Sequence, residues 1–593
     1  MAFQVSPGVL VQERDLTSII PAVSTSIGAV AGQFTKGPLD EIVSISSEQE
    51  LVETFGKPDV NNFEYFFSAA NFLQYSNTLR VVRANQTSQV NASTSGTGVL
   101  VKNTEDWTNN YASGGAAGNA TFVAREAGAY GNTLLVATCP HAAAFEEEGA
   151  TTVNDASTAV GDTAITVTAG ANLNVGDVIS FSTTAATNDY DDGEQYRVTN
   201  ISTNDLTIVQ HPRGSGGLKR TITDGANVRR RWRYYDAVDG APGTSDWTST
   251  RNGANDEIHI VVVDEDGSIS GVPGQILETY SKVSKASDAK TPQGDDNYYP
   301  NVIYTKSRYI WWTKHHSSGS NWGNAASGTT FTAVDTPTNE SLSGGSDGSA
   351  VTTGQLKTAY DKFADSETVD VGLIISGKCD STHVENLITI AEARKDCVVF
   401  ASPERADVVN VTNTNTQKDN VIDFYSSISS SSYVFFDSGY KYMYDRYNDV
   451  YRYVPLNGDM AGLAARTDLI ADSWFSPAGF NRGVVRGAVK LAFNPTKTQR
   501  DELYPKRINP VATFPGQGTV LFGDKTGLSS PSAFDRINVR RLFITLEKAI
   551  ATASKFQLFE FNDEFTRANF RNIVEPFLRE VQGRRGITDF LVV

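Results

Sequence analysis

The chain opens with a short alternation of apolar and polar residues. The apolar members are Phe3, Val5, Val9 and Val11, placed on either side of Pro7-Gly8. This period of two predicts an extended strand that is interrupted once. A strand so close to a terminus needs a sheet edge to pair with, in its own chain or in a neighbouring one. We therefore expect residues 1–20 to form an arm.

The next segment, residues 21–99, mixes helix and strand patterns. The expected elements are a helix capped by Ser46 or Ser47 and ended by Gly56, a buried aromatic-rich helix at 63–75 and a strand at 79–83. Such a mixture is typical of the first part of an α/β region.

Between residues 100 and 255 the chain becomes rich in Thr, Ala, Gly, Asn and Asp. Short alternating runs at 164–167 and 177–181 are separated by turn-forming clusters such as 188–193. This spacing predicts one or two small all-β domains, inserted into the main body. The small polar residues favour an exposed, outer location.

Residues 256–473 return to an α/β pattern. The expected elements are an apolar strand at 258–263, a helix at 276–284, a strand–helix–strand unit at 369–403, a hairpin at 440–454 and a helix at 458–472. In the 369–403 unit, Ser381 or Thr382 opens the helix. We expect its two strands to be parallel, joined by a right-handed crossover.

The last segment, residues 474–593, contains the two strongest amphipathic helices. Their apolar stripes comprise Val539, Leu542, Leu546, Ala549, Ile550 and Ala553 in the first, and Phe570, Ile573, Val574, Phe577, Leu578 and Val581 in the second. Asn562 is expected to cap the second helix, and Pro576 to kink or restart it. The chain ends in a β-type run at 587–593, whose candidate strand residues are Phe590, Leu591 and Val592.

Length and composition indicate a multidomain globular protein. At 593 residues the chain is too long for one hydrophobic core, and its 39% hydrophobic and 20% charged residues are ordinary. No run approaches the roughly 18 apolar residues that a membrane span needs. The amino terminus lacks a secretory pattern, so we expect synthesis in a cytoplasm. Three widely spaced cysteines suggest neither a disulfide framework nor a zinc site. Cys379 and Cys397 flank one expected helix and favour buried apolar positions.

Charge is unevenly distributed. Residues 474–593 contain 18 Lys and Arg against 11 Asp and Glu, a net charge of +7, within a chain of net charge -17. An acidic body with a basic carboxy-terminal domain suggests that the two parts meet different neighbours. The alternative is that the basic residues merely solvate a helix face.

The chain lacks the familiar motifs of catalysis and of cofactor binding. It has no G-x-S-x-G, no G-x-x-x-x-G-K-[ST] and no H-E-x-x-H, and its six histidines are scattered. Ser376-Gly377 follows a strand where α/β folds bind ligands, but a tight turn is the favoured interpretation. Asp264, Asp266 and Gly267 form a fragment of a calcium loop without its spacing, so a turn is favoured there too. We expect no enzyme activity, cofactor or metal.

One dense basic cluster, at residues 229–233, includes a tryptophan. Because the surrounding body is acidic, we expect acidic partners within the chain and no direct contact with nucleic acid.

Ordered segments along the chain resemble the contractile tail sheath family of myoviruses, the relatives of the T-even phage sheath. They are 6–15, 28–32, 37–38, 55–56, 124–132, 342–348, 393–396, 476–479, 482–483, 538–542 and 559–562. Each motif alone is weak, whereas their order over nearly the whole chain is specific.

The resemblance implies an α/β and β multidomain fold. A conserved α+β inner domain would be formed by both chain ends and face the tail tube. It would be joined to an α/β middle domain with parallel strands and to inserted all-β outer domains. It implies a homo-oligomeric helical sheath that pairs arms between neighbouring subunits, contracts from a metastable state and drives the tube through the host envelope. The implied partners are the tube, baseplate and tail terminator proteins, in the virion tail after assembly in host cytoplasm, without membrane insertion.

The basic inner domain would then face an acidic tube surface, and Arg540, Arg541 and Lys548 are the candidate tube-facing residues. Packing of these residues against the domain's own acids is the alternative. The family continues past the position of Val593, so we expect a truncated chain or a missing carboxy-terminal arm.

Three other functions are compatible with parts of the pattern. A sheath subunit of a phage-tail-like injection particle is the nearest, and the long β insertion favours a phage over it. A secreted β-rich adhesin conflicts with the α/β core, and an enzyme built on the βαβ unit lacks a catalytic constellation.

Overall fold

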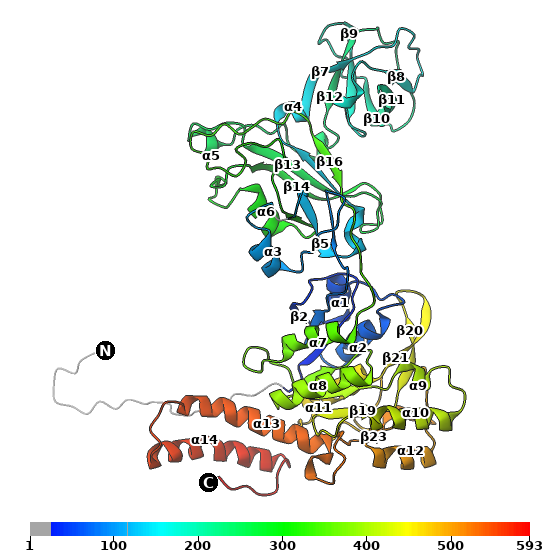
Figure 1. Ribbon diagram of the computed structural model, residues 1–593, viewed down its shortest axis with the longest axis vertical. Helices are drawn as coiled ribbons and strands as arrows, with labels where there is room; N and C mark the ends of the chain where they lie inside the picture. Colours follow the sequence, from blue (N-terminus) through cyan, green and yellow to red (C-terminus); the bar gives the residue numbers. More distant parts are fainter. Residues whose placement is uncertain (1–24, 116, 593) are drawn as a thin grey trace, which may run out of the picture. The chain divides into compact units, whose positions relative to one another are not determined.

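The computed structural model describes residues 25–115 and 117–592 (Figure 1). The chain divides into two compact units. Unit 1 contains the described residues up to 86 and from 350 onward, and unit 2 contains residues 87–349. Unit 2 is therefore inserted between two halves of unit 1.

Unit 1 is built on a seven-stranded, mostly parallel sheet. Its strands, in spatial order, are β2 (Ile42–Ile45), β3 (Leu79–Arg83), β1 (Gly28–Gly32), β17 (Leu373–Ile375), β18 (Val398–Ala401), β19 (Val434–Asp437) and β23 (Ile508–Asn509). Only β2 runs antiparallel to its neighbour. Helix α8 (Ser381–Arg394) joins the parallel strands β17 and β18, which confirms the predicted βαβ unit.

Helices of unit 1 pack on this sheet and bury the residues between them. They include α1 (Glu48–Phe55), α2 (Phe63–Leu73), α7 (Thr353–Tyr360), α10 (Thr414–Ser426), α11 (Asn457–Ile470) and α12 (Lys497–Leu503). Ser47 caps α1, accepting a hydrogen bond from the amide of Glu50, so this predicted helix start is confirmed. A Cβ on Gly32 would lie 2.5 Å from the ring of Tyr65, so only glycine allows α2 to lie this close to β1.

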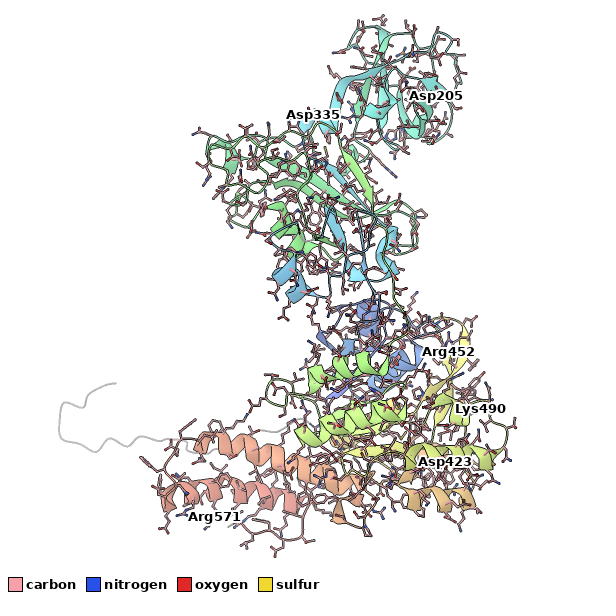
Figure 2. The ribbon with its side chains drawn as sticks, in the orientation of Figure 1. Asp205, Asp335, Asp423, Arg452, Lys490 and Arg571 are labelled. Carbon is pink, nitrogen blue, oxygen red and sulfur yellow. The ribbon has the colours of Figure 1, made fainter. Side chains whose placement is uncertain are left out.

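Two small antiparallel sheets complete unit 1. The first contains β20 (Tyr440–Asp445), β21 (Val450–Pro455) and β22 (Lys490–Leu491), and β20–β21 is the predicted hairpin. Lys490 lies on this sheet (Figure 2). Its ammonium lies 4.8 Å from the ring of Tyr442. The second is the hairpin of β24 (Val511–Phe514) and β25 (Gly518–Leu521).

Two long helices, α13 (Ile537–Ser554) and α14 (Glu564–Gly583), pack side by side near the carboxyl end (Figure 1). Asp563, not Asn562, caps α14, because its carboxylate reaches the amide of Thr566. Helix α14 continues through Pro576 without a restart.

Unit 2 contains three antiparallel sheets. The first contains, in spatial order, β7 (Glu146–Thr152), β12 (Ala226–Arg231), β9 (Val178–Ala185), β10 (Gln195–Ser202), β11 (Asp205–His211) and β8 (Ala164–Thr166). The second contains β14 (Gln275–Ser284), β13 (Glu257–Asp264), β6 (Leu134–Cys139) and β16 (Thr338–Ser341). The third contains β15 (Ile310–Trp312), β5 (Phe122–Ala127) and β4 (Asn91–Ser93). The short helices α3 (Thr104–Asn110), α5 (Asp246–Ser249) and α6 (Tyr299–Lys306) lie between the strands.

The structure corrects two predictions for this region. Residues 276–284 are not a helix but most of β14, whose pairing with the buried strand β13 overrides the local pattern. Residues 256–349 do not belong with the α/β unit, because β13 pairs with β14 on one side and with β6 of the inserted segment on the other.

Candidate functional site

The carboxyl edge of the parallel strands in unit 1 is closed by the chain itself. Open α/β sheets bind ligands at this edge. Asn457, the first residue of α11, donates its side-chain amide to Ser376 Oγ at 3.1 Å and to Gly377 O at 2.8 Å. Its backbone amide donates to Ser402 Oγ at 3.0 Å, and Ser402 donates to the Asp437 carboxylate at 2.7 Å. The first turn of α11 therefore occupies the position that a ligand would take.

A hollow of about 1010 Å³ lies beside this edge within unit 1. Its walls carry three cations, Lys378, Arg405 and Arg452, and three carboxylates, Glu64, Asp380 and Glu404. Lys378 lies 4.0 Å from Glu64, whose pKa is raised by burial. Because carboxylates balance the cations, the hollow offers no net attraction to a phosphate or another anion.

Within the described ranges, no group of three His, Cys, Asp or Glu side chains could hold a metal ion. All three cysteines are buried, which confirms the predicted position of Cys379 and Cys397, and burial raises the pKa of Cys379 to about 12. Burial also lowers the pKa of His383 to about 4, so its ring is neutral near pH 7. None of these groups is in the activated state that catalysis needs. No described helix is long and apolar enough to cross a membrane.

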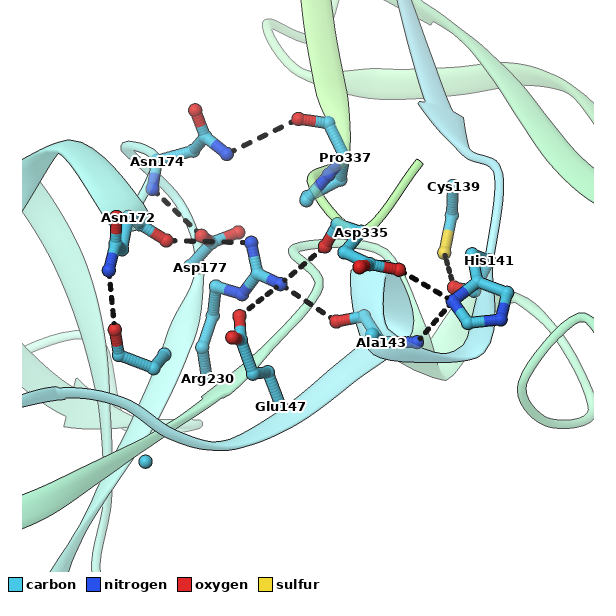
Figure 3. A network of polar contacts seen from close by, with 12 residues as sticks. Cys139, His141, Ala143, Glu147, Asn172, Asn174, Asp177, Arg230, Asp335 and Pro337 are labelled. Carbon is cyan, nitrogen blue, oxygen red and sulfur yellow. Dashed lines mark hydrogen bonds and ion pairs between the residues drawn. The ribbon is translucent and has the colours of Figure 1, made fainter. Parts of the chain in front are cut away.

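The basic cluster in unit 2 is neutralised by its own chain, as predicted. The ion pairs join Arg229 to Asp192, Arg230 to Glu147 at 3.0 Å and Arg231 to Glu146 at 2.9 Å. Arg230 is fully buried and also donates to the backbone oxygens of Ala143 and Asp335, so it ties the six-stranded sheet to the adjoining segments (Figure 3). Acidic partners within unit 2 therefore hold these three arginines.

The three candidate tube-facing residues lie on α13 and contact their own unit. Arg540 is 7% exposed and lies over a tyrosine ring, and Arg541 is 2% exposed and pairs with Asp468 at 2.6 Å. Lys548 pairs with Asp370. Arg540 and Arg541 are therefore buried within unit 1, where a cation needs a partner nearby. Contact of Arg540, Arg541 and Lys548 with the tube stays a prediction. The alternative, packing against the unit's own acids, describes Arg541 and Lys548.

The structure describes only one of the two chain ends for which pairing with a neighbour is expected, the amino-terminal arm and the carboxy-terminal strand. Phe3, Val5, Val9 and Val11 lie outside the described residues. Residues 587–592 form no strand within their own chain, and a strand that pairs Phe590, Leu591 and Val592 with a neighbouring copy stays a prediction. A strand needs a hydrogen-bonded neighbour, whereas Phe590 and Val592 rest on the apolar cluster of α13 and α14 and Leu591 is 85% exposed.

Sequence reasoning missed the exposed aromatic surfaces of unit 1. One is the turn between α13 and α14, and the other is the hairpin β24–β25 with the ring of Phe480 beside it. A signal was present for the turn. Five large apolar residues fall within 556–565, between the two amphipathic helices and outside both apolar stripes.

Three family models match successive parts of the chain. Residues 25–84 match the domain III N-terminal region of the tail sheath protein Gp18, 349–527 the phage tail sheath protein central domain, and 529–593 the phage tail sheath C-terminal domain. The chain is also 33% identical to the tail sheath protein of Enterobacteria phage T4, across 99% of this chain and 92% of that one. The chain belongs to the phage tail sheath protein family. This confirms the resemblance found in the sequence.

A second phage protein and two solved structures are also similar to this chain. The tail sheath protein of Vibrio phage KVP40 is 31% identical across 99% of this chain and 92% of its own. Among solved structures, the sheath tail protein of Desulfitobacterium hafniense matches with a TM-score of 0.46 and 11% identity, covering 98% of this chain and 91% of that chain. The sheath of an extracellular contractile injection system in its contracted state matches with a TM-score of 0.33 and 21% identity, covering 41% and 62%. Homology to these phage proteins indicates a structural component of a contractile phage tail.

Proposed function

We propose that this sheath protein polymerises as a helical tube around the tail tube and contracts from a metastable extended state. Contraction then drives the tube through the host envelope for genome ejection. The observation that carries the proposal is the relationship to the phage T4 tail sheath protein along almost the whole chain. The partners are further copies of the chain, the tube protein, and the baseplate and tail terminator proteins. Assembly takes place in the host cytoplasm.

The physical requirements of such a machine fit a chain without catalytic chemistry. A contact between two different surfaces that does not close into a ring generates an open helix. An extended amino-terminal arm, with Phe3, Val5, Val9 and Val11 paired to a neighbour, would keep subunits linked while they rotate. A kinetic barrier holds the extended state, so the energy for contraction is stored during assembly and needs no cofactor.

Purified tails test this proposal. Contraction triggered by mild denaturant should proceed equally with added ATP and after enzymatic removal of nucleotide, with electron microscopy scoring sheath length. Dependence of contraction on ATP would refute the stored-energy mechanism.

A further inference from the structure

The turn between α13 and α14 exposes an unusual number of large apolar side chains. Their exposed fractions are 73% for Phe556, 62% for Leu558, 106% for Phe559, 84% for Phe561 and 73% for Phe565. Single exposed apolar residues are normal on a protein surface, but a contiguous group of this kind marks an interaction site. The turn projects from the end of the helix pair that lies away from the sheet of unit 1 (Figure 1).

The same turn is acidic and holds one ring outward. Glu560 and Glu564 are exposed, and neither forms an ion pair with a residue in the described part of the chain. Phe559 has a φ of 70°, a left-handed conformation that bulky residues rarely adopt. Its side chain is fully exposed. The turn is therefore an apolar projection with negative charge at its base.

A basic, aromatic pocket lies elsewhere on unit 1, at the hairpin β24–β25. The hollow measures about 520 Å³ and is lined by Lys497, Arg500, Asp501, Tyr504, Pro510 and Phe522. The rings of Phe514 and Phe522 lie 5.2 Å apart, and that of Phe480 lies 5.3 Å from Phe514. Phe480 and Phe522 are each 44% exposed. The pocket thus has the ring of Phe522 in its lining, and the rings of Phe514 and Phe480 beside it.

The two cations at this pocket, Lys497 and Arg500, favour an acidic binding partner. The guanidinium of Arg500 lies over Phe514 and Phe522, at 5.3 and 5.6 Å from the ring centroids. Lys497 is exposed, and neither cation pairs with a carboxylate among residues 25–115 and 117–592. Opposite charge on turn and pocket favours their association and selects its orientation.

The turn cannot fill the pocket of its own chain. Within unit 1, the α13–α14 turn and helix α12, which carries Lys497 and Arg500, lie at opposite ends (Figure 1). Apolar projection and apolar pocket are therefore complementary surfaces that only two copies can bring together.

We propose that the Phe556–Phe565 turn of one copy inserts into the pocket of the next copy that Lys497, Arg500 and Phe522 line, beside the rings of Phe480 and Phe514. Each buried phenylalanine removes on the order of 150 Å² or more of surface from water, which supplies the affinity. Glu560 and Glu564 then face Lys497 and Arg500. Because donor and acceptor are different surfaces, the contact is head-to-tail and can repeat indefinitely. The inference rests on the proposed polymer and names one of its subunit contacts.

Cysteine cross-linking tests the contact directly in the full-length chain. The variants Phe559→Cys and Phe480→Cys are made separately, mixed, assembled and treated with a short bismaleimide. The native cysteines are buried and leave the background low. We expect a covalent dimer in the mixture and none from either variant alone. A dimer from Phe559→Cys alone would indicate a symmetric contact, and tubes without any dimer would indicate another occupant; each result overturns the inference.

Charge reversal provides an independent test. Lys497→Glu should raise the protein concentration at which tubes form by about tenfold or more. Combining it with Glu560→Arg and Glu564→Arg should restore most of that loss. Lys306→Glu, an exposed charge reversal in unit 2, is the matched control and should have no effect. Equal effects of Lys497→Glu and the control, or no recovery in the combined variant, would overturn the contact. Failure of the unmodified chain to form tubes would instead contradict the proposed function itself.

Discussion

Replacing Lys441 by methionine tests how unit 1 tolerates an unpaired buried charge. The ammonium of Lys441 lies 2.9 Å from the Asp459 carboxylate, and both side chains are completely buried. Tyr75 donates a further hydrogen bond to Asp459 at 3.0 Å, and Lys441 also donates to the backbone oxygen of Arg486. These contacts join β20 and α11 to the segment that follows the end of α2.

The expected loss follows from the desolvated geometry. Removing one partner of a buried ion pair leaves an uncompensated charge and costs about 3–5 kcal/mol. The double variant Lys441→Met, Asp459→Asn removes both charges and keeps a hydrogen-bond partner for Tyr75, so it should recover most of this loss. Burial already raises the pKa of Asp459, and loss of Lys441 raises it further. The folded single variant then binds a proton that the unfolded chain releases, so its deficit should grow as the pH rises above the ordinary carboxyl pKa of about 4.

The two units can be followed separately in urea unfolding. Six of the seven tryptophans, at 107, 232, 247, 311, 312 and 322, lie in unit 2, whereas the longest helices lie in unit 1. Lys441→Met should lower the urea midpoint seen by circular dichroism at the helix band and leave the midpoint seen by tryptophan fluorescence unchanged. A circular-dichroism loss below about 1 kcal/mol, or an equal shift of both signals, would refute the reasoning.

Three further outcomes follow from single side chains. Asp177 is completely buried and its pKa is raised to about 6, mainly by burial, so between pH 4 and 6 the folded state holds a proton that the unfolded state has lost. The stability of unit 2 should therefore fall by about 3 kcal/mol as pH rises through this range. Asp177→Asn should abolish this pH dependence in fluorescence-monitored unfolding. Arg541→Met should destabilise unit 1 by about 3 kcal/mol because Asp468 loses its charged partner, with α13 amides exchanging faster in hydrogen-exchange mass spectrometry; unchanged exchange would contradict this. Gly32→Ala should lower the circular-dichroism midpoint by about 1–3 kcal/mol because its methyl meets the ring of Tyr65, and a neutral result would show that α2 yields freely.

Local patterns carried much of the fold of unit 1. The sequence identifies the stripe and cap of α1, the aromatic run of α2 and the apolar strands around α8, because residues close together in the chain determine each of these patterns. Residues 276–284 failed because a neighbouring buried strand, and not local propensity, decides their conformation. The end of unit 2 at residue 349 was missed for the same reason, since strand pairing across more than 100 residues defines it.

The partner surfaces were harder to predict. Net charge identified residues 474–593 as basic, but it could not show that Arg540 and Arg541 are buried inside unit 1. Conversely, Phe559 reads as one more apolar residue after a helix stripe, and only its full exposure reveals a candidate contact. Burial separates these two cases, and burial depends on tertiary packing.

Electron microscopy of the purified full-length chain tests the central claim most directly. Overexpressed and concentrated without any phage component, the protein should form long hollow tubes of uniform diameter with a helical repeat. Uniform monomers or closed rings at every concentration and salt condition would contradict its assignment as a self-polymerising sheath subunit.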